Sequence, residues 1–257
     1  MKNLIVFFLL LTSATTSCAQ THFFMLNGQR TAIDVASTIN TYYEEASSKG
    51  IWSCIPTVLE YAAKELHLSK AEYLYGISYI RGIDRNKNID KGIIWLKKSA
   101  DKGLKDALGE LGAYYLELGN YSDAERYLLK ASTVGANWAY YNLGKLYMEL
   151  NKAELAEKYY KLAINYGPKG QLEALQNLYR LLARQVRIID ILPLLRMGAE
   201  SYNDPYSQGR LGEILYTYGA NCDKVPSNKD KEEGKMWLKK SADRGDARAK
   251  QFLSKIK

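Results

Sequence analysis

Apolar residues recur along most of the chain at the spacing of one face of an α-helix. Leu108, Leu111 and Tyr115, for example, fall on a single helical stripe. Similar stripes return at a near-constant interval, each centred on a Leu or Tyr that is usually followed by Gly. These centres lie 36, 32, 35 and 33 residues apart, at Tyr75-Gly76, Leu111-Gly112, Leu143-Gly144, Leu178-Tyr179 and Leu211-Gly212. Periods of this size predict a tandem array of two-helix repeats.

A second motif alternates with the first. The sequence Trp-Leu-Lys-Lys-Ser-Ala-Asp-Lys-Gly at 95–103 returns with a single change at 237–245, and looser copies occupy 127–131 and 159–163. Each repeat is therefore predicted to contain a first helix, a turn and a second helix. In the second repeat, the second helix is expected at about 121–133.

Particular residues mark where these helices should begin and end. Asn88 and the segment 122–125 offer side chains for N-terminal caps. Pro193 is expected to interrupt the second helix of the fourth repeat, because proline lacks the N–H that a helix interior uses. A glycine suited to a left-handed C-terminal cap follows the second helix in four repeats, at Gly103, Gly135, Gly167 and Gly245.

Helical segments also flank the array. Residues 33–47 and 56–67 read as two helices within an N-terminal cap or degenerate repeat at 20–68. The tail 246–257 reads as a capping helix, which repeat arrays need because each repeat buries its apolar face only against its neighbours. No Pro- or Ser-rich linker divides the repeats at 69–245, which predicts one continuous solenoid.

The first and last repeats resemble a known family, the Sel-one-like (Sel1-like) repeats, which are relatives of the tetratricopeptide repeats. The resemblance implies an all-α fold, a right-handed α-α superhelix of about five to six helix-turn-helix repeats. The middle repeats are closer to the tetratricopeptide form. In the first repeat the resemblance is carried by Tyr75-Gly76, Tyr79, Gly82, Asp90-Lys91-Gly92, Trp95-Leu96, Ser99-Ala100 and Gly103, and in the last by Leu211-Gly212, Lys231, Gly234, Trp237, Ala242 and Gly245.

Residues 1–19 have the layout of a secretory signal peptide. Lys2 precedes the apolar run 4–11, and a stretch of small and polar residues follows at 12–19. Cleavage after Ala19 would release a periplasmic or secreted protein. Alternatively, Cys18 would be lipidated and would anchor the protein to a membrane, although Thr15 departs from the usual bacterial lipoprotein box. The apolar run is shorter than the ~20 residues that a transmembrane helix needs.

Composition narrows the chemistry. The chain has 257 residues, with 36 Lys and Arg against 28 Asp and Glu, and 47% of its residues are hydrophobic. This balance excludes a mainly disordered chain, and the positive charge suits an acidic partner protein or an anionic membrane surface rather than nucleic acid in an exported protein.

The only two histidines, His22 and His67, argue against a histidine metal centre, and no cofactor or catalytic motif is found. Cys54 and Cys222 are expected to stay unpaired at opposite ends of an elongated array.

A partner is expected on the groove-lining face of the first helices. In the resembled families this face, made by positions two and five residues on either side of the central Leu, lines a concave groove. The chain is thus predicted to be an exported, non-catalytic protein-interaction module. An envelope immunity protein that neutralises a toxic effector, possibly a lipase, and a cell-wall-ligand binder or enzyme are the alternatives. For Trp138 and Tyr141, packing between repeats is an equal alternative to binding. The predicted groove residues are Tyr73, Ile77, Trp138, Tyr141, Lys145, Met148, Arg180, Arg184, Tyr206, Glu213 and Tyr216.

Overall fold

The computed structural model describes residues 55–83, 85–167, 170–222 and 225–256. Twelve α-helices and no strand occur within these ranges, which confirms the predicted all-α helical-repeat fold. The described helices divide into two compact units, and the division falls in the sequence between Ala136 and Asn137. The predicted signal peptide, Cys18, Cys54 and the predicted helix at 33–47 lie outside the described residues.

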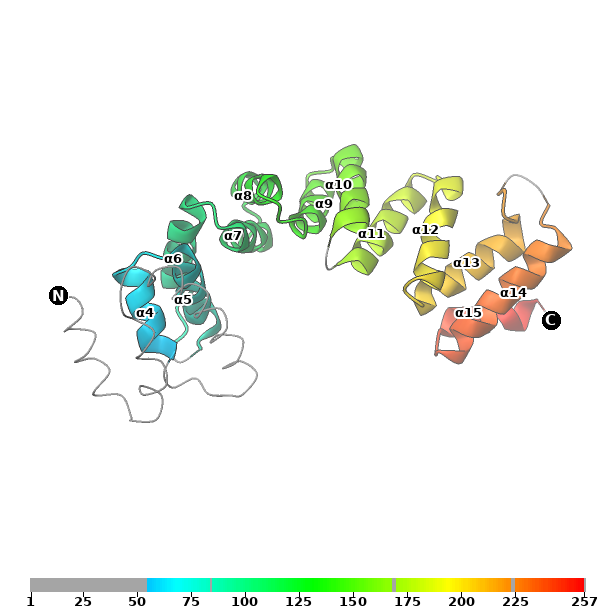
Figure 1. Cartoon of the computed structure of the whole chain (residues 1–257). Coiled ribbons are helices and arrows are strands. Elements are labelled where there is room, and N and C mark those ends of the chain that lie inside the picture. Colours follow the sequence, from blue (N-terminus) through cyan, green and yellow to red (C-terminus); the bar gives the residue numbers. More distant parts are fainter. Residues whose placement is uncertain (1–54, 84, 168–169, 223–224, 257) are drawn as a thin grey trace. The chain divides into compact units, whose positions relative to one another are not determined.

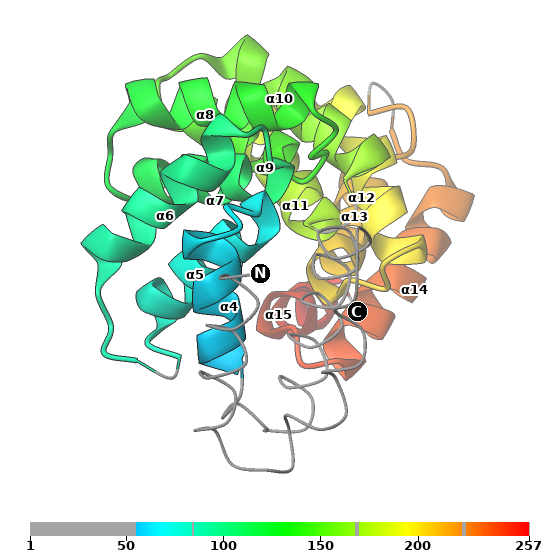
Figure 2. The same ribbon diagram turned by 60° about the vertical axis from the view of Figure 1, so that its left-hand side comes forward.

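In the N-terminal unit, each helix packs against the next one along the chain. Figure 1 and Figure 2 show this succession of antiparallel pairs from two directions. The first described helix of the unit ends at Lys64, three residues before the end that the sequence predicted. Its elements are α4 (Ile55–Lys64), α5 (Ser69–Arg81), α6 (Ile89–Asp101), α7 (Lys105–Glu117) and α8 (Tyr121–Thr133).

The C-terminal unit repeats the same arrangement and ends in the predicted capping helix. Consecutive helices again pack together, and α13 also contacts the capping helix α15. The elements are α9 (Ala139–Glu149), α10 (Ala153–Tyr166), α11 (Gln171–Arg184), α12 (Ile188–Glu200), α13 (Pro205–Tyr218), α14 (Asn228–Asp243) and α15 (Ala247–Lys255).

Glycines allow the two helices of a repeat to cross closely. A Cβ atom on Gly76 of α5 would lie 2.9 Å from the Gly92 carbonyl oxygen of α6, and one on Gly212 would lie 2.7 Å from the Gly234 carbonyl oxygen. Both distances are too short for a real side chain, so only glycine fits at these crossings. The central residues of the two stripes, Tyr75 and Leu211, directly precede these glycines and are buried.

Within the first repeat, and again within the last, a side-chain hydrogen bond joins the two helices of the repeat. Ser99 Oγ donates to the Ser69 carbonyl oxygen at 2.6 Å, and Ser241 Oγ donates to the Pro205 carbonyl oxygen at 2.7 Å. Both serines are fully buried, so a satisfied hydrogen bond is needed at each site. The repeated Ser-Ala of the sequence motif thus fixes the end of one helix to the start of another.

Several predicted helix ends are confirmed and two are wrong. Gly103, Gly135 and Gly245 have φ values of 79°, 81° and 97°, as expected for left-handed C-terminal caps. Gly167 has a φ of −71° and leaves α10 in an extended conformation instead. The cap of α8 is the Asn120 side chain, which accepts from the Asp123 N–H, so segment 122–125 lies inside the helix. The Asn88 side chain caps α6 as predicted.

Pro193 does not interrupt its helix. Helix α12 runs without a break from Ile188 to Glu200 with Pro193 inside it. The proline ring lies on the exposed face, where water can hydrate the Ile189 carbonyl oxygen that has lost its N–H donor. The opposite face of the helix, which includes Ile191 and Leu195, is buried in the core.

Candidate protein-binding surface

The predicted groove residues differ in their accessibility. Lys145, Arg180 and Arg184 are exposed, whereas Ile77 is only 4% exposed and belongs to the core of the N-terminal unit. Ile77 is therefore not available to a partner, because its position on α5 is covered by packing. The remaining predicted residues are half-buried: Tyr73, Trp138, Tyr141, Met148, Tyr206, Glu213 and Tyr216. In the N-terminal unit, the Lys70 ammonium lies 4.8 Å from the centre of the Tyr73 ring.

On α9, Tyr141 occupies a position between repeats. A Cβ atom on Gly170 would lie 3.6 Å from Tyr141 Cγ, and the Tyr160 ring centre lies 6.3 Å from that of Tyr141. Lys145 follows one turn later, with its ammonium 5.8 Å from the Tyr141 ring centre. Tyr141 thus both packs and remains partly accessible, so packing and partner binding are compatible at this position.

On α11, two arginines extend the exposed positive charge. Arg180 Nη1 donates to Asn177 Oδ1 at 3.3 Å, and Arg184 lies in the last turn of the helix. Helix α9 contacts α11, so the two helices are neighbours in the unit. Whether the predicted residues of α9 and α11 form one continuous patch stays a prediction.

On α13, aromatic and charged side chains are fixed by their neighbours. The Tyr206 ring meets the Tyr179 ring edge to face at 5.6 Å, and the Arg210 guanidinium lies 5.4 Å from the Tyr206 ring centre. Burial, together with the charge of Tyr206, raises the pKa of Tyr179 to about 12. The Tyr179 phenol is therefore neutral at physiological pH and acts as a hydrogen-bonding aromatic surface.

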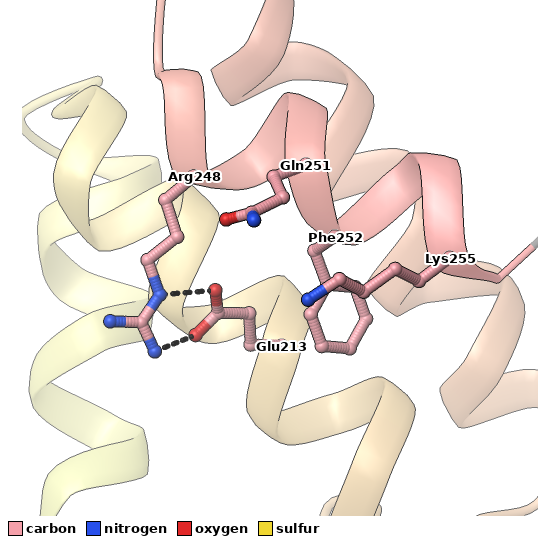
Figure 3. Close-up of a pocket in the computed structure, with 5 residues that line it drawn as sticks. All are labelled: Glu213, Arg248, Gln251, Phe252 and Lys255. Carbon is pink, nitrogen blue, oxygen red and sulfur yellow. Dashed lines mark hydrogen bonds and ion pairs between the residues drawn. The ribbon is translucent and has the colours of Figure 1, made fainter.

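A pocket opens where α13 meets the capping helix α15 (Figure 3). It has a volume of about 320 Å³ and is lined by Glu213, Arg248, Gln251, Phe252 and Lys255. Figure 3 shows that Arg248, Gln251, Phe252 and Lys255 come from α15 and that Glu213 comes from α13. The Phe252 ring also meets the Tyr216 ring edge to face at 5.9 Å. The pocket thus combines an aromatic wall with cationic and amide donors.

The negative charge of Glu213, the one carboxylate among the residues that line the pocket, is balanced by two arginines. Arg248 holds Glu213 with two hydrogen bonds, Nε to Oε1 at 2.6 Å and Nη2 to Oε2 at 2.9 Å (Figure 3). Arg210 Nη1 donates to the same Oε2 at 2.9 Å. Burial raises the pKa of Glu213, and the positive charge of Arg210 opposes this rise. Since two arginines share one carboxylate and Lys255 adds a further cation, the pocket carries excess positive charge.

Four of the residues that line this pocket were missed from the sequence. Arg248, Gln251, Phe252 and Lys255 lie in the tail, which was interpreted only as a cap. Their spacing of three, one and three residues places them on one face of a helix, which was the available signal. Glu213 alone was predicted, as a groove position of the last repeat.

No group of three or more His, Cys, Asp or Glu side chains in the part of the chain that the structure describes is placed to hold a metal ion. None of the helices there is both long and apolar enough to cross a membrane.

Family models match three segments of the chain. The Sel1 repeat model matches residues 69–104 and 205–246, and the tetratricopeptide repeat model matches residues 139–169. These segments coincide with the first, last and third repeats predicted from periodicity. The comparison with curated proteins gave no match.

Solved structures share the fold at low sequence identity. The protective antigen c5321 of uropathogenic Escherichia coli, with an SLR fold, aligns at a TM-score of 0.73 and 20% identity over 94% of this chain and 52% of the antigen. This chain therefore spans about half the length of that antigen. A Sel1 repeat protein from Oxalobacter formigenes aligns at 0.56 and 22% identity over 94% and 97% of the two chains. YrrB, a tetratricopeptide repeat protein with an unusual peptide-binding site, aligns at 0.51 and 16% identity over 75% and 95%.

Proposed function

We propose that this chain, which contains Sel1-like repeats, binds an acidic segment of another protein. The binding surface is the face formed by the first helices of the repeats in the C-terminal unit. Repeats of this class act as protein-binding scaffolds because stacked helix pairs present long, shaped surfaces. The finer roles expected from the sequence, export from the cell and neutralisation of a toxic effector, remain proposals.

The pocket between α13 and α15 carries this proposal. A carboxylate of the partner would meet the cations Arg248 and Lys255, and an adjoining apolar side chain would cover the Phe252 ring. Aromatic and arginine side chains at a partly buried site are the residue types that contribute most to protein interfaces. Excess positive charge in the pocket favours an acidic partner segment over a basic one.

Titration with labelled peptides tests the proposal. A peptide in which two glutamates flank a phenylalanine should bind the full chain more tightly than the same peptide with glutamines, as measured by fluorescence anisotropy. Combining Phe252→Ala with Lys255→Glu should weaken the acidic peptide at least about tenfold, while the helical circular dichroism is unchanged. The combination Tyr141→Ala and Arg180→Glu tests whether the surface extends to α9 and α11.

The matched control reverses the charge of four lysines on second helices. Lys97, Lys98, Lys239 and Lys240 are all exposed and lie outside the pocket. Reversing them should leave the peptide affinity almost unchanged at physiological salt, because exposed charges away from an interface contribute little. Loss of binding in the lysine variant, with binding kept in the pocket variant, would show that the partner binds the second-helix face instead.

A further inference from the structure

The three charged residues that meet at one side of the pocket between α13 and α15 differ in exposure. The Arg248 side chain keeps 59% of its surface exposed, whereas Glu213 keeps 13% and Arg210 keeps 19%. Glu213 and Arg210 lie three residues apart on α13, and Arg248 reaches Glu213 from α15 (Figure 3). Arg248 can therefore leave this contact by rotating into solvent, while Glu213 and Arg210 are held in place by their surroundings.

Glu213 occupies a position that is not acidic in the other repeats. It lies two residues after the central Leu211 of the last repeat. Burying a carboxylate is unfavourable unless other groups compensate its charge, so the packing of the repeat does not explain a glutamate here. Glu213 therefore belongs to the pocket rather than to the repeat. The equivalent residues of the first four repeats are Ile77, Ala113, Lys145 and Arg180.

Glu213 occupies the N–H groups of Arg248 that a partner carboxylate would use. It accepts from Nε and Nη2, which together form the two-pronged edge that fits a carboxylate (Figure 3). In contrast, the side chains of Gln251 and Lys255 make no hydrogen bond or ion pair with any residue that the structure describes. An acidic segment can thus approach Lys255 directly, but it must displace Glu213 to bind this edge of Arg248.

Arg210 makes such an exchange possible. Its Nη1 donates to Glu213 Oε2 at 2.9 Å, and its guanidinium lies 5.4 Å from the Tyr206 ring centre. When Arg248 leaves, Glu213 keeps this second arginine, so the exchange does not leave a buried carboxylate unpaired, which would be strongly unfavourable. Each of the two carboxylates, that of Glu213 and that of the partner, would then face one arginine.

We propose that Glu213 is an internal competitor of the partner's carboxylate. In the free protein it holds Arg248, and an acidic segment binds by taking Arg248 over. This inference rests on the proposed function and adds that Glu213 sets the affinity of the pocket. Only a segment whose carboxylate reaches Arg248 while an apolar side chain covers Phe252 offsets the lost contact, so Glu213 also discriminates against neutral segments.

Fluorescence anisotropy with the full chain and the peptide in which two glutamates flank a phenylalanine tests the competition. The Glu213→Gln variant should bind this peptide at least about tenfold more tightly than the parent chain, because Arg248 is no longer held by a charged acceptor. The peptide with glutamines should bind both chains equally weakly. Helical circular dichroism and melting of the variant should match those of the parent chain.

A double-mutant cycle separates competition from a general effect of charge, because removing any nearby negative charge would favour an acidic peptide. In an Arg248→Gln background, Glu213→Gln should change the affinity less than about twofold, since the contact it releases is already gone. Equal gains in both backgrounds would overturn the proposal. The matched control is Glu232→Gln, which removes an exposed carboxylate of α14 outside this pocket and should leave the affinity unchanged.

The NMR signal of the Arg248 Nε–H group reports the exchange in a chain that keeps Glu213. This signal is identified by its loss in Arg248→Lys, and it should shift when the acidic peptide is added to the parent chain but not when the glutamine peptide is added. A parent chain that does not bind the acidic peptide would remove the proposed function and this inference together. A parent chain that binds it with an unmoved Arg248 signal, or without a gain in Glu213→Gln, would overturn the inference alone.

Discussion

Single glycines set how closely the two helices of a repeat can approach. In the middle repeats, a Cβ atom on Gly112 would lie 2.5 Å from Leu128 Cγ, and one on Gly144 would lie 2.5 Å from Tyr160 Cδ1. Leu128 and Tyr160 are themselves buried, so neither side chain can move aside into solvent. A larger residue at either glycine must therefore push two packed helices apart.

We expect Gly112→Leu and Gly144→Leu each to lower the free energy of unfolding by about 1–3 kcal/mol through this overpacking. Urea denaturation followed by circular dichroism measures the change. Ala183→Leu is the control, because Ala183 is exposed in the last part of α11 and a leucine there meets solvent. Equal midpoints for the parent chain and both glycine variants would contradict the close crossing of these helices.

Val186, in contrast, is expected to lower the stability of the fold, because its backbone has a left-handed conformation. Replacing it with asparagine should raise the free energy of unfolding by about 1 kcal/mol, because asparagine tolerates the left-handed conformation that valine resists. The same denaturation assay applies. Ile189→Asn, at an exposed position with helical backbone, should give no such gain. A Val186→Asn variant that is no more stable than the parent would mean that the turn is not strained.

At the scale of helices, the sequence predicts elements well where repeats copy one another and poorly where they depart. The copied Trp95-to-Gly103 motif predicts α6 and α14 together with their glycine caps. The prediction at Pro193 was wrong, because helix propensity does not indicate which face of a helix is exposed to water. The pocket was missed for a related reason: α15 lies outside the repeat period, so Phe252 and Lys255 had no equivalent positions for comparison.

Ion pairs also join second helices of neighbouring repeats. Arg187, which precedes α12, donates to Glu157 of α10 at 2.6 Å, and Arg196 of α12 donates to Glu233 of α14 at 2.8 Å. The Arg187 guanidinium, with a smaller contribution from Lys161, holds the pKa of Glu157 below its ordinary value of 4.5. The pair therefore stabilises the fold above the unfolded pKa of Glu157, and this contribution is lost as the pH falls through the lowered folded value.

We expect Glu157→Gln to reduce the loss of stability between about pH 6 and pH 3, since the variant has no carboxylate to protonate there. The difference should be about 0.2–1 kcal/mol, the range of partly exposed ion pairs. Urea midpoints at the two pH values measure it. Glu154→Gln, an exposed carboxylate three residues earlier on α10, should retain the pH dependence of the parent chain. If Glu157→Gln retains it too, the pair does not couple α10 to α12 in solution.

At the scale of the whole molecule, the position of the protein in the cell decides which partners it can meet. The N-terminal sequence has Ser17 and Ala19 at the spacing that signal peptidase accepts, and Thr15 stands where a lipoprotein box usually has leucine. Cleavage before Gln20 would remove Lys2 alone among the charged residues, so the net charge would fall by one from +8 to +7. The exported protein would keep the positive charge that favours an acidic partner.

We therefore expect the exported protein to be unanchored and to begin at Gln20. Its intact mass, measured by mass spectrometry after expression in a bacterium with both export pathways, should equal that of residues 20–257 without any adduct. A Cys18→Ser variant should then give the same mass and the same aqueous fractionation, because Cys18 would leave with the signal peptide. A diacyl or triacyl adduct on Cys18, abolished in Cys18→Ser, would instead place the protein on a membrane. The acidic segment it binds would then have to be sought among proteins that reach that surface.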